Sequence, residues 1–570
     1  MTVPCSEYES IGRLCRSERS RSEASPPLTR RGAGEGGGVV WFIVATRPPR
    51  PRHSRVQPLL DKEGPLVRSS RRSPVGGCRR SRSGLAFDTP HPLPYVEETR
   101  AAEGLRRRIH RRRVNMGACE QRLAKFVTET NPDTIPPESY RAALQASFDC
   151  IGVSLAGAAQ PQGKMIVDFV DAQGGNSQCT IIGNKLRSSP YLAALANGTL
   201  GHALDYDDMG GFGHPTVALL PTALAVGEQL GRSGRDILTA YVLGFEVAVH
   251  LNKGSENVQG LTGFHSTAVF GTISATAVAA RMMGLTAQQT VMAFGLAGSM
   301  PSGILQNFGS YTKPLHAGMS CRSGVMAASL AKQGWFATDA FLDSRVGWAH
   351  AYIGENRYDP EKMTANLGKA WHSKDTIVIK KYPCCGSNHG ALDSLISMLK
   401  EHDIKLDDIA RVEVDNVPAI SHVLLHPNPA QGYQGKFSLH YNIATALVDR
   451  KIDIDSFTDA KLNRPEYREA REKTRVNVMS NWDPEYEHGP TYNPVTITLK
   501  NGERLSKRTN RRTMHGAPAD PLSEQELKDK FRSCARLCLP EKQVEEAIDS
   551  WWSLDRAPKL TEALKSVTPR

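Results

Sequence analysis

The sequence has no apolar run long enough to cross a lipid bilayer. The run Val39–Ala45 has only 7 residues, whereas a spanning helix needs about 20. It also lies too far from the N-terminus for an ordinary signal peptide. We therefore expect neither a membrane segment nor a secretory signal.

Regular cysteine spacing is also absent. The chain has 11 cysteines, and 8 of them lie after residue 115, where Cys384 and Cys385 are adjacent and the others are scattered. Without a secretory signal, such cysteines are typical of a reduced, intracellular protein. We expect a cytoplasmic or mitochondrial location.

Excess charge is missing from most of the chain, although the formal net charge is +12. Residues 1–115 hold 24 of the 71 Lys and Arg residues but only 11 of the 59 Asp and Glu residues, so residues 116–570 hold 47 basic and 48 acidic residues. Nucleic-acid-binding domains usually present a basic surface. The nearly neutral body therefore argues against a nucleic-acid partner.

Residues 1–115 are predicted to be a disordered basic extension, because Ser/Arg clusters, prolines and a glycine run replace hydrophobic periodicity. Their Arg/Ser-rich start is compatible with a mitochondrial targeting segment, but their length and acidic residues are not typical of one. Met116 begins the first stretch with helical patterning. Two interpretations stay open: a biological tail, or sequence upstream of the true start.

Small residues at helical spacing dominate residues 116–375. Segments 140–160, 189–208 and 265–285 place apolar or small side chains three to four positions apart. Abundant Ala and Gly allow helices to approach closely, and Gly284 and Gly334 are expected to end helices. These residues are predicted to form the first part of an all-helical domain.

Strand patterns begin at residue 376. We expect strands within 375–383, 409–417 and 474–480 and a hairpin around Asn501–Gly502, interleaved with helices over 390–402 and 437–450. Helical patterns return after residue 516, where Ser523 and Glu526 form a capping pair. The predicted fold is mostly α, with an inserted α+β domain at 376–515 acting as a lid and the helical domain completed by 516–570. No internal repeat is evident.

The stretch "GHALDYDDMGGFGHPT", residues 201–216, contains two histidines and three aspartates. We expect a helix through Asp208, so that His202 and Asp205 share a face, and we expect Pro215 to keep His214 extended.

Three interpretations of this stretch are open. A metal site would use His202, Asp205, Asp208 and His214, but their spacing matches no standard motif, and we expect no metal. A polar helix end with capping side chains is a second interpretation. The third is an acid–base pocket in which Asp205 orients or charges His214.

Other polar groups favour the pocket. His265 stands at the glycine-flanked start of a helix, and Lys313 precedes a proline with His316 nearby. Where strand is expected to give way to helix, the chain has Lys380, Lys381, Cys384, Cys385 and His389. Lysines and helix-start amides together make a good carboxylate cradle. The plainer alternatives are a capping histidine, solvent-facing lysines and buried cysteines.

Taken together, the motifs "HALDYDD", "GHP", "GFH", "TKPLHAG" and "KKYPCCGSNHGALD" occur in this order, and on them the chain resembles the MmgE/PrpD family from about Cys119 to Ser566. The family includes 2-methylcitrate dehydratase, cis-aconitate decarboxylase and related enzymes acting on small polycarboxylates. The resemblance implies an all-helical body with an inserted α+β lid, a homodimer and a lyase without a cofactor.

The resemblance also implies roles for individual residues. The catalytic residues carried over are Asp205, His214, His265 and Lys313. The substrate-binding residues expected are Lys380, Lys381, Cys385, His389 and His316. Two positions depart from animal-type decarboxylases, since Met209 stands where they have threonine and Cys385 where they have histidine. Fungal-type decarboxylases resemble this chain in having "CCG" followed by histidine.

The segment "KPLHAG" looks more like the decarboxylase branch, so we expect a cis-aconitate decarboxylase-like, itaconate-forming enzyme. A 2-methylcitrate dehydratase-like hydro-lyase and an inactive dimeric scaffold of the same fold stay open. The lysines would bind the carboxylates, and His214 or His265 would deliver a proton, with Asp205 favouring the charged imidazole. Both reactions need an imidazole, a carboxylate and a lysine cage, so the sequence does not separate them.

Overall fold

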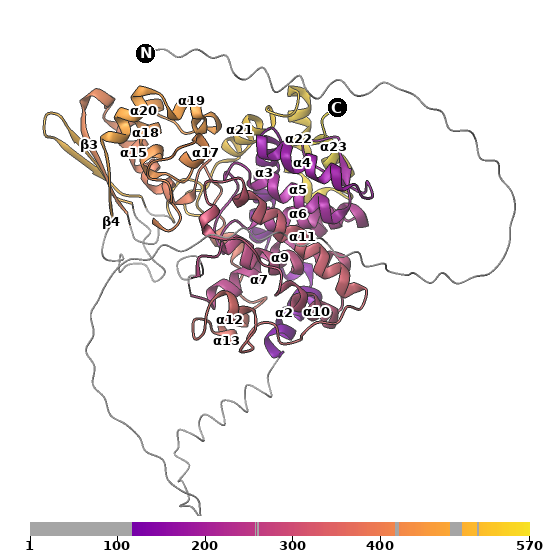
Figure 1. Cartoon of the computed structure of the whole chain (residues 1–570). Helices are drawn as coiled ribbons and strands as arrows, with labels where there is room; N and C mark the ends of the chain where they lie inside the picture. Colours follow the sequence, from indigo (N-terminus) through magenta and orange to yellow (C-terminus); the bar gives the residue numbers. More distant parts are fainter. Residues whose placement is uncertain (1–116, 257, 259–261, 417–420, 479–492, 510–511) are drawn as a thin grey trace, which may run out of the picture. The chain divides into compact units, whose positions relative to one another are not determined.

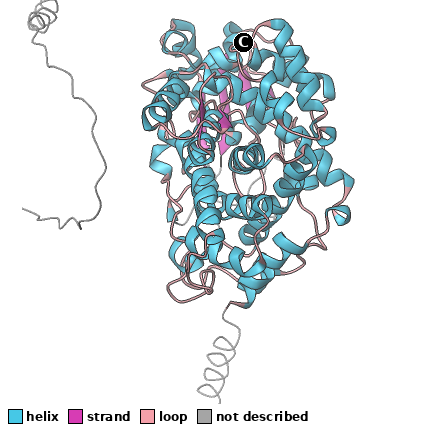
Figure 2. Cartoon of the chain, turned by 90° about the vertical axis from the view of Figure 1, so that its right-hand side faces the viewer, coloured by secondary structure: helices cyan, strands magenta, loops and turns pink. Residues whose placement is uncertain are grey.

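The computed structural model describes residues 117–570, apart from 257, 259–261, 417–420, 479–492 and 510–511. The extension predicted over residues 1–115 lies outside the described residues. Within them the chain is mostly helical with a small mixed sheet (Figure 2).

Helices form most of the described chain between residues 117 and 376 (Figure 1). They are α2 (Ala118–Glu129), α3 (Pro137–Ala158), α4 (Pro161–Gln173), α5 (Pro190–His202), α6 (Thr216–Leu230), α7 (Gly234–Lys253), α9 (Ser266–Met283), α10 (Ala287–Ala297), α11 (Thr312–Lys332), α12 (Trp348–Tyr352), α13 (Pro360–Thr364) and α14 (Ser373–Thr376). A two-stranded antiparallel pair, β1 (Cys179–Thr180) and β2 (Arg187–Ser188), lies between α4 and α5.

The remaining elements alternate between helix and strand before the chain ends in helices. They are α15 (His389–Glu401), β3 (Ile409–Asn416), α17 (Gly432–Gly435), α18 (Leu439–Asp449), α19 (Asp459–Leu462), α20 (Pro465–Glu472), β4 (Thr474–Val478), β5 (Val495–Leu499), β6 (Arg504–Lys507), α21 (Glu524–Ala535), α22 (Glu541–Trp552) and α23 (Thr561–Ser566). Short 3₁₀ turns lie at Pro132–Thr134, Leu305–Asn307, Gly386–Asn388, Leu406–Asp408, Ile454–Phe457 and Leu554–Arg556.

Glycines let α11 pack against α5 and α9, as the small-residue pattern predicts. A Cβ atom on Gly318 of α11 would lie 2.3 Å from the Leu195 carbonyl oxygen of α5, and one on Gly324 would lie 2.7 Å from the Ala275 Cβ of α9. Neither distance leaves room for a larger side chain. This packing fixes the start of α11, which carries Lys313 and His316.

Helix ends confirm some predictions and correct one. Gly284 ends α9 at a φ of 64°, and Gly334 follows α11 at a φ of 92°. The helix expected through Asp208 ends instead at His202. Asp205 adopts a left-handed φ of 52°, which an α-helix cannot continue, so His202 and Asp205 do not share a helical face.

The four-stranded sheet has the order β4-β3-β5-β6, with β3 parallel to β4 and antiparallel to β5. The hairpin predicted around Asn501–Gly502 is confirmed, and Gly502 has a φ of 89°. The strand predicted within 375–383 is wrong. Val378 forms a single bridge with Met209, while the next amide, of Ile379, donates to Gly516. Successive backbone groups thus bond to different segments, and no ladder forms.

The C-terminal helices pack against the first ones. The Ser523 side chain and the Glu526 carboxylate form the predicted capping box at the start of α21. Phe531 of α21 stacks on Phe148 of α3 with ring centroids 4.6 Å apart. This contact brings the end of the chain onto the helices that begin it.

Among the residues that the structure describes, no single helix has both the length and the apolar character needed to cross a membrane. One pair, α3 and α4, meets those criteria only together, with an 85° bend between them.

Candidate active site

Eight polar side chains from separate segments meet in one buried group, here called the His–Lys cluster. Its members are His202 at the end of α5, Asp205 and Asp207 in the loop that follows, His214 before α6, His265 before α9, Lys313 and His316 in the first turns of α11, and Lys380 after α14. Most are no more than 5% exposed, whereas the His214 side chain retains 13% exposure.

Asp205 joins the two lysines of the cluster. Its Oδ1 atom accepts from Lys313 Nζ at 3.0 Å and from Lys380 Nζ at 2.7 Å. Lys380 Nζ also donates to the Asp205 carbonyl oxygen at 2.8 Å. Burial disfavours the carboxylate, but the two ammonium groups outweigh burial and hold the pKa of Asp205 well below its usual range.

Hydrogen-bond partners assign the proton positions on two imidazoles. Lys313 Nζ lies 2.7 Å from His202 Nε2 and 3.5 Å from His214 Nε2. Because an ammonium group only donates, these Nε2 atoms accept. The Nδ1 atoms then carry the protons. His202 Nδ1 donates to Asp207 Oδ1 at 2.8 Å, whereas His214 Nδ1 donates to the Asp208 carbonyl oxygen at 3.0 Å and lies 3.1 Å from Asp207 Oδ2.

The imidazoles of the cluster are neutral near pH 7. Burial and the neighbouring ammonium groups lower the pKa of His214 to about 3, and burial together with Lys313 lowers the pKa of His316 to about 4. The pKa values of His202 and His265 are lowered as well, mainly by burial.

The prediction that Asp205 holds His214 in its charged form is not supported, since the pKa of His214 is lowered to about 3. Asp205 Oδ1 lies 3.6 Å from His214 Nε2, but its charge is already compensated by Lys313 and Lys380. Asp207 Oδ2, at 3.1 Å, is the nearer carboxylate oxygen.

His265 forms a second imidazole pair with His316. Their Nδ1 atoms are 3.2 Å apart, and the His265 ring stands edge-on to Phe308 at a centroid distance of 4.9 Å. The His265 side chain caps no backbone amide of α9, so the capping alternative is not what the structure shows. The ring instead faces the cluster, 6.2 Å from the His214 ring.

Three residues predicted to bind substrate lie outside the His–Lys cluster. The Lys381 side chain is 41% exposed and faces Asp393 at 3.8 Å. His389 Nε2 lies 3.3 Å from the Cys384 carbonyl oxygen. Cys385 is buried beside the cluster, and burial raises the pKa of its thiol.

Sequence reasoning assigned no role to Asp207 or Lys436 and considered His202 only as a metal ligand. Asp207 reaches His202 because the helix ends early. Lys436 is buried, donates to the Pro383 carbonyl oxygen at 2.7 Å, and has its pKa lowered by burial to about 7. No local pattern marks Lys436, since only the folded chain brings it to this segment.

The donors of the predicted metal site do not all converge. Asp208 turns to Thr216, whose Oγ1 donates to it at 2.8 Å, and burial raises the Asp208 pKa well above its usual range. His202, Asp205, Asp207 and His214 do place ligand atoms within 4.8 Å of one another. Lys313 Nζ already contacts three of these side chains.

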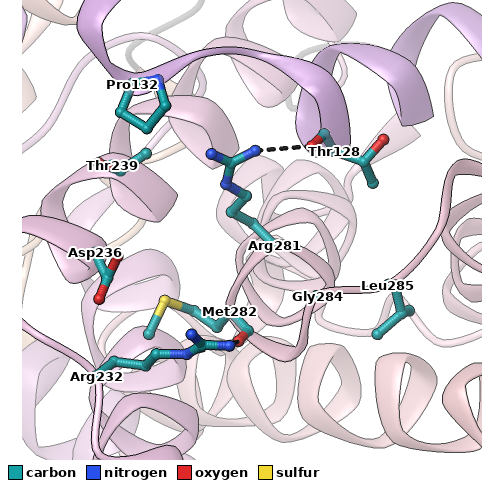
Figure 3. Close-up of a pocket in the computed structure, with 9 residues that line it drawn as sticks. All are labelled: Thr128, Pro132, Arg232, Asp236, Thr239, Arg281, Met282, Gly284 and Leu285. Atoms are coloured by element: carbon teal, nitrogen blue, oxygen red, sulfur yellow. Dashed lines mark hydrogen bonds between the residues drawn. The ribbon is translucent and has the colours of Figure 1, made fainter.

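A separate cavity of about 380 Å³ lies elsewhere in the described residues (Figure 3). It is lined by Thr128, Pro132, Arg232, Asp236, Thr239, Arg281, Met282, Gly284 and Leu285. Its guanidinium groups cap helix ends, since Arg281 donates to the Thr128 carbonyl oxygen and Arg232 to that of Met282. None of the site residues predicted from the sequence lines this cavity.

Two family models match the chain: the MmgE/PrpD N-terminal domain over residues 121–361 and the MmgE/PrpD C-terminal domain over residues 382–554. The chain is 28% identical to a cis-aconitate decarboxylase of Homo sapiens over 437 residues, 74% of this chain and 89% of that protein. It is 26% identical to a cis-aconitate decarboxylase of Aspergillus terreus over 469 residues, 78% and 94% of the respective lengths. A mitochondrial 2-methylcitrate dehydratase of Yarrowia lipolytica is 24% identical over 407 residues, 64% and 74% of the lengths. All three relatives carry the names of lyases.

Proposed function

The chain belongs to the MmgE/PrpD family, and on that premise we propose that it is a lyase acting on a small polycarboxylate, with cis-aconitate decarboxylation as the first candidate reaction. The observation that carries the proposal is the burial of Lys313 and Lys380 beside neutral imidazoles. Two ammonium groups bind carboxylates, and an imidazole that gains a proton can deliver it to carbon.

Charge balance supports a multiply charged substrate. With the imidazoles neutral, Lys313 and Lys380 are balanced by Asp205 and Asp207. A di- or tricarboxylate adds two or three negative charges, which raise the pKa of nearby imidazoles. His214 is the expected proton acceptor because its side chain is more exposed than those of the other histidines of the cluster and because its Nε2 carries no proton.

The decarboxylation step then follows from the cluster. In cis-aconitate, the bond from the methylene carbon to its carboxylate breaks, and carbon dioxide leaves. The released electron pair forms the new double bond to the central carbon, while the former double bond takes a proton at its other carbon. An imidazolium at His214 or His265 supplies that proton, and the lysines hold the remaining carboxylates.

Dehydration of 2-methylcitrate is the second candidate, because a relative of that name matches 64% of the chain. Here a base removes a carbon-bound proton and an acid protonates the departing hydroxyl group.

An inactive scaffold of the same fold is the third candidate. Met209 is one of the two positions that depart from the animal-type decarboxylases. Its sulfur packs against Gly386, since a Cβ atom on that glycine would lie 1.9 Å from the sulfur.

We also propose that residues 376–515 act as a lid on the helical residues, which carry most of the cluster. The contacts that join the two parts include Lys380 with Asp205, the Tyr433 hydroxyl with the Ala203 carbonyl oxygen at 3.0 Å, and His426 Nε2 with the Phe308 carbonyl oxygen at 2.8 Å. Breaking these contacts would expose the cluster to substrate.

A homodimer is part of the proposal. Apolar side chains on α4 and α11 remain exposed in the single chain, with Met165 at 60%, Phe169 at 49% and Met326 at 40%. Such groups often mark a subunit interface. Light scattering that gives the mass of one chain at micromolar concentration would contradict it.

Proton NMR of the full chain with cis-aconitate, and separately with 2-methylcitrate, tests the function. Itaconate formed from cis-aconitate supports the decarboxylase, and loss of water from 2-methylcitrate supports the hydro-lyase. Conversion of neither substrate contradicts both candidates. In that case, a thermal shift with cis-aconitate distinguishes an inactive carboxylate-binding site from a scaffold, which should show no shift.

A further inference from the structure

A buried lysine near the end of the chain contacts Lys380 and Tyr206, the residue that follows Asp205. Lys530 lies on α21 and is 8% exposed. Its Nζ donates to the Tyr206 carbonyl oxygen at 2.9 Å and to the Lys380 carbonyl oxygen at 2.8 Å. Neither contact uses the side chains that form the cluster.

These two carbonyl groups belong to the segments that must meet for the cluster to exist. Tyr206 directly follows Asp205 in the loop after α5, and Lys380 is itself a member of the His–Lys cluster. The Tyr206 hydroxyl adds a weaker tie between the same segments by donating to the Lys381 carbonyl oxygen at 3.2 Å.

Lys530 has a buried counterion. Its Nζ lies 2.7 Å from Asp149 Oδ1 on α3, and the Asp149 side chain is 2% exposed. Within the described residues, Asp149 Oδ2 has no hydrogen-bond partner. The carboxylate thus serves mainly to balance the Lys530 charge, since a buried ammonium without a counterion is strongly disfavoured.

We propose that Lys530 is a positioning residue that holds the backbones of Tyr206, which follows Asp205, and of Lys380 in register, with Asp149 as its counterion. The inference rests on the proposed function, because it assigns Lys530 to that same site. Among the described residues, Lys530 Nζ bonds to two backbone carbonyl oxygens and to Asp149, so it acts on the cluster through the two backbones.

The charge surroundings of Asp149 support this arrangement. Its charge interacts with Lys530 and Cys534 of α21, Cys150 of α3, Tyr206, Asp207, Asp208 and Lys380. Burial raises the Asp149 pKa to about 6, although Lys530 opposes the rise. Below that pH the counterion is lost, and we expect the hold on the two backbones to weaken.

The test uses the full chain with the double variant Asp149→Asn/Lys530→Met, which removes both charges together. Lys530→Arg is the conservative variant, and Lys528→Met is the control on the same helix, because Lys528 pairs with Glu524 at the surface. Thermal unfolding first establishes that each variant is folded. The double variant should then have a kcat at least tenfold lower than that of the wild type, with a smaller change in KM. The wild type should lose activity as the pH falls below 6, where Asp149 is protonated, and the double variant should lack this loss. Lys530→Arg should retain most of the wild-type activity, because it keeps the positive charge.

A measurement without substrate separates this proposal from the proposed function. Brief acetylation followed by mass spectrometry reports the reactivity of each lysine. Lys380, which is fully buried, should become several-fold more reactive in the double variant but not in Lys528→Met. A folded double variant with unchanged Lys380 reactivity would overturn the positioning role, whether or not the wild-type chain converts either substrate.

Discussion

The cluster should take up protons when a tricarboxylate binds, and the size of the effect follows from its geometry. Free His214 has a pKa lowered to about 3. One carboxylate placed about 4 Å from the ring contributes roughly 4 kcal/mol at an effective dielectric constant of about 20, which corresponds to about three pKa units. One ligand carboxylate would therefore raise the pKa of His214 from about 3 to about 6, and a second would raise it above 7. We expect about one proton taken up per bound ligand at pH 7.5.

Calorimetry with citrate checks this prediction. The binding enthalpy is measured in buffers of different ionisation enthalpy at pH 7.5, and the slope of one against the other gives the number of protons exchanged. Because the bound pKa exceeds the free pKa, the citrate affinity should fall as pH rises through the bound value. The variant His214→Gln should bring the slope close to zero, whereas Lys381→Gln should not. A wild-type enthalpy independent of the buffer would refute the charge argument.

Three further predictions concern single residues. Lys313→Gln should lower the affinity for cis-aconitate at least tenfold, measured by calorimetry, because one charge-assisted contact is worth about 1.5–3 kcal/mol; the adjacent-site control Lys381→Gln should bind normally. His214→Ala should cut turnover by roughly 10²-fold or more if it is an acid–base group, and near-normal initial rates would remove it from the mechanism. Asp205→Asn should cost about 3–5 kcal/mol in the free energy of unfolding, because it removes the carboxylate that both buried ammonium groups contact; urea titration showing a loss below about 1 kcal/mol would argue that the lysines are not both charged.

The sequence predicted the elements better than the contacts between them. Helix ends at Gly284 and Gly334 and the hairpin at Asn501–Gly502 follow from local chemistry, and the structure confirms them. The family resemblance drawn from five motifs is confirmed by both family models. The strand expected within 375–383 is wrong because successive backbone amides bond to separate segments rather than to one neighbouring strand.

The partners within the candidate site depended on features that local patterns do not carry. The left-handed turn at Asp205 brings Asp207 onto His202 and directs the Asp205 carboxylate to the two lysines. A left-handed aspartate is uncommon, and nothing in the flanking residues announces it. Lys530 is separated from Lys380 by 150 positions, so only the packing of α21 against α3 could reveal that contact.

The bond from Asp205 to both lysines makes substrate binding an exchange. A carboxylate that reaches Lys313 and Lys380 replaces one that the protein already holds there. The exchange alters the number of ion pairs little, so added salt should weaken binding less than it does where a charged ligand meets unpaired surface lysines. A ligand with a single carboxylate only replaces the ion pairs of Asp205 and so gains little binding free energy. A ligand with two or three carboxylates can make further contacts with the remaining ones. Competition from Asp205 should therefore make the site select ligands with more than one carboxylate.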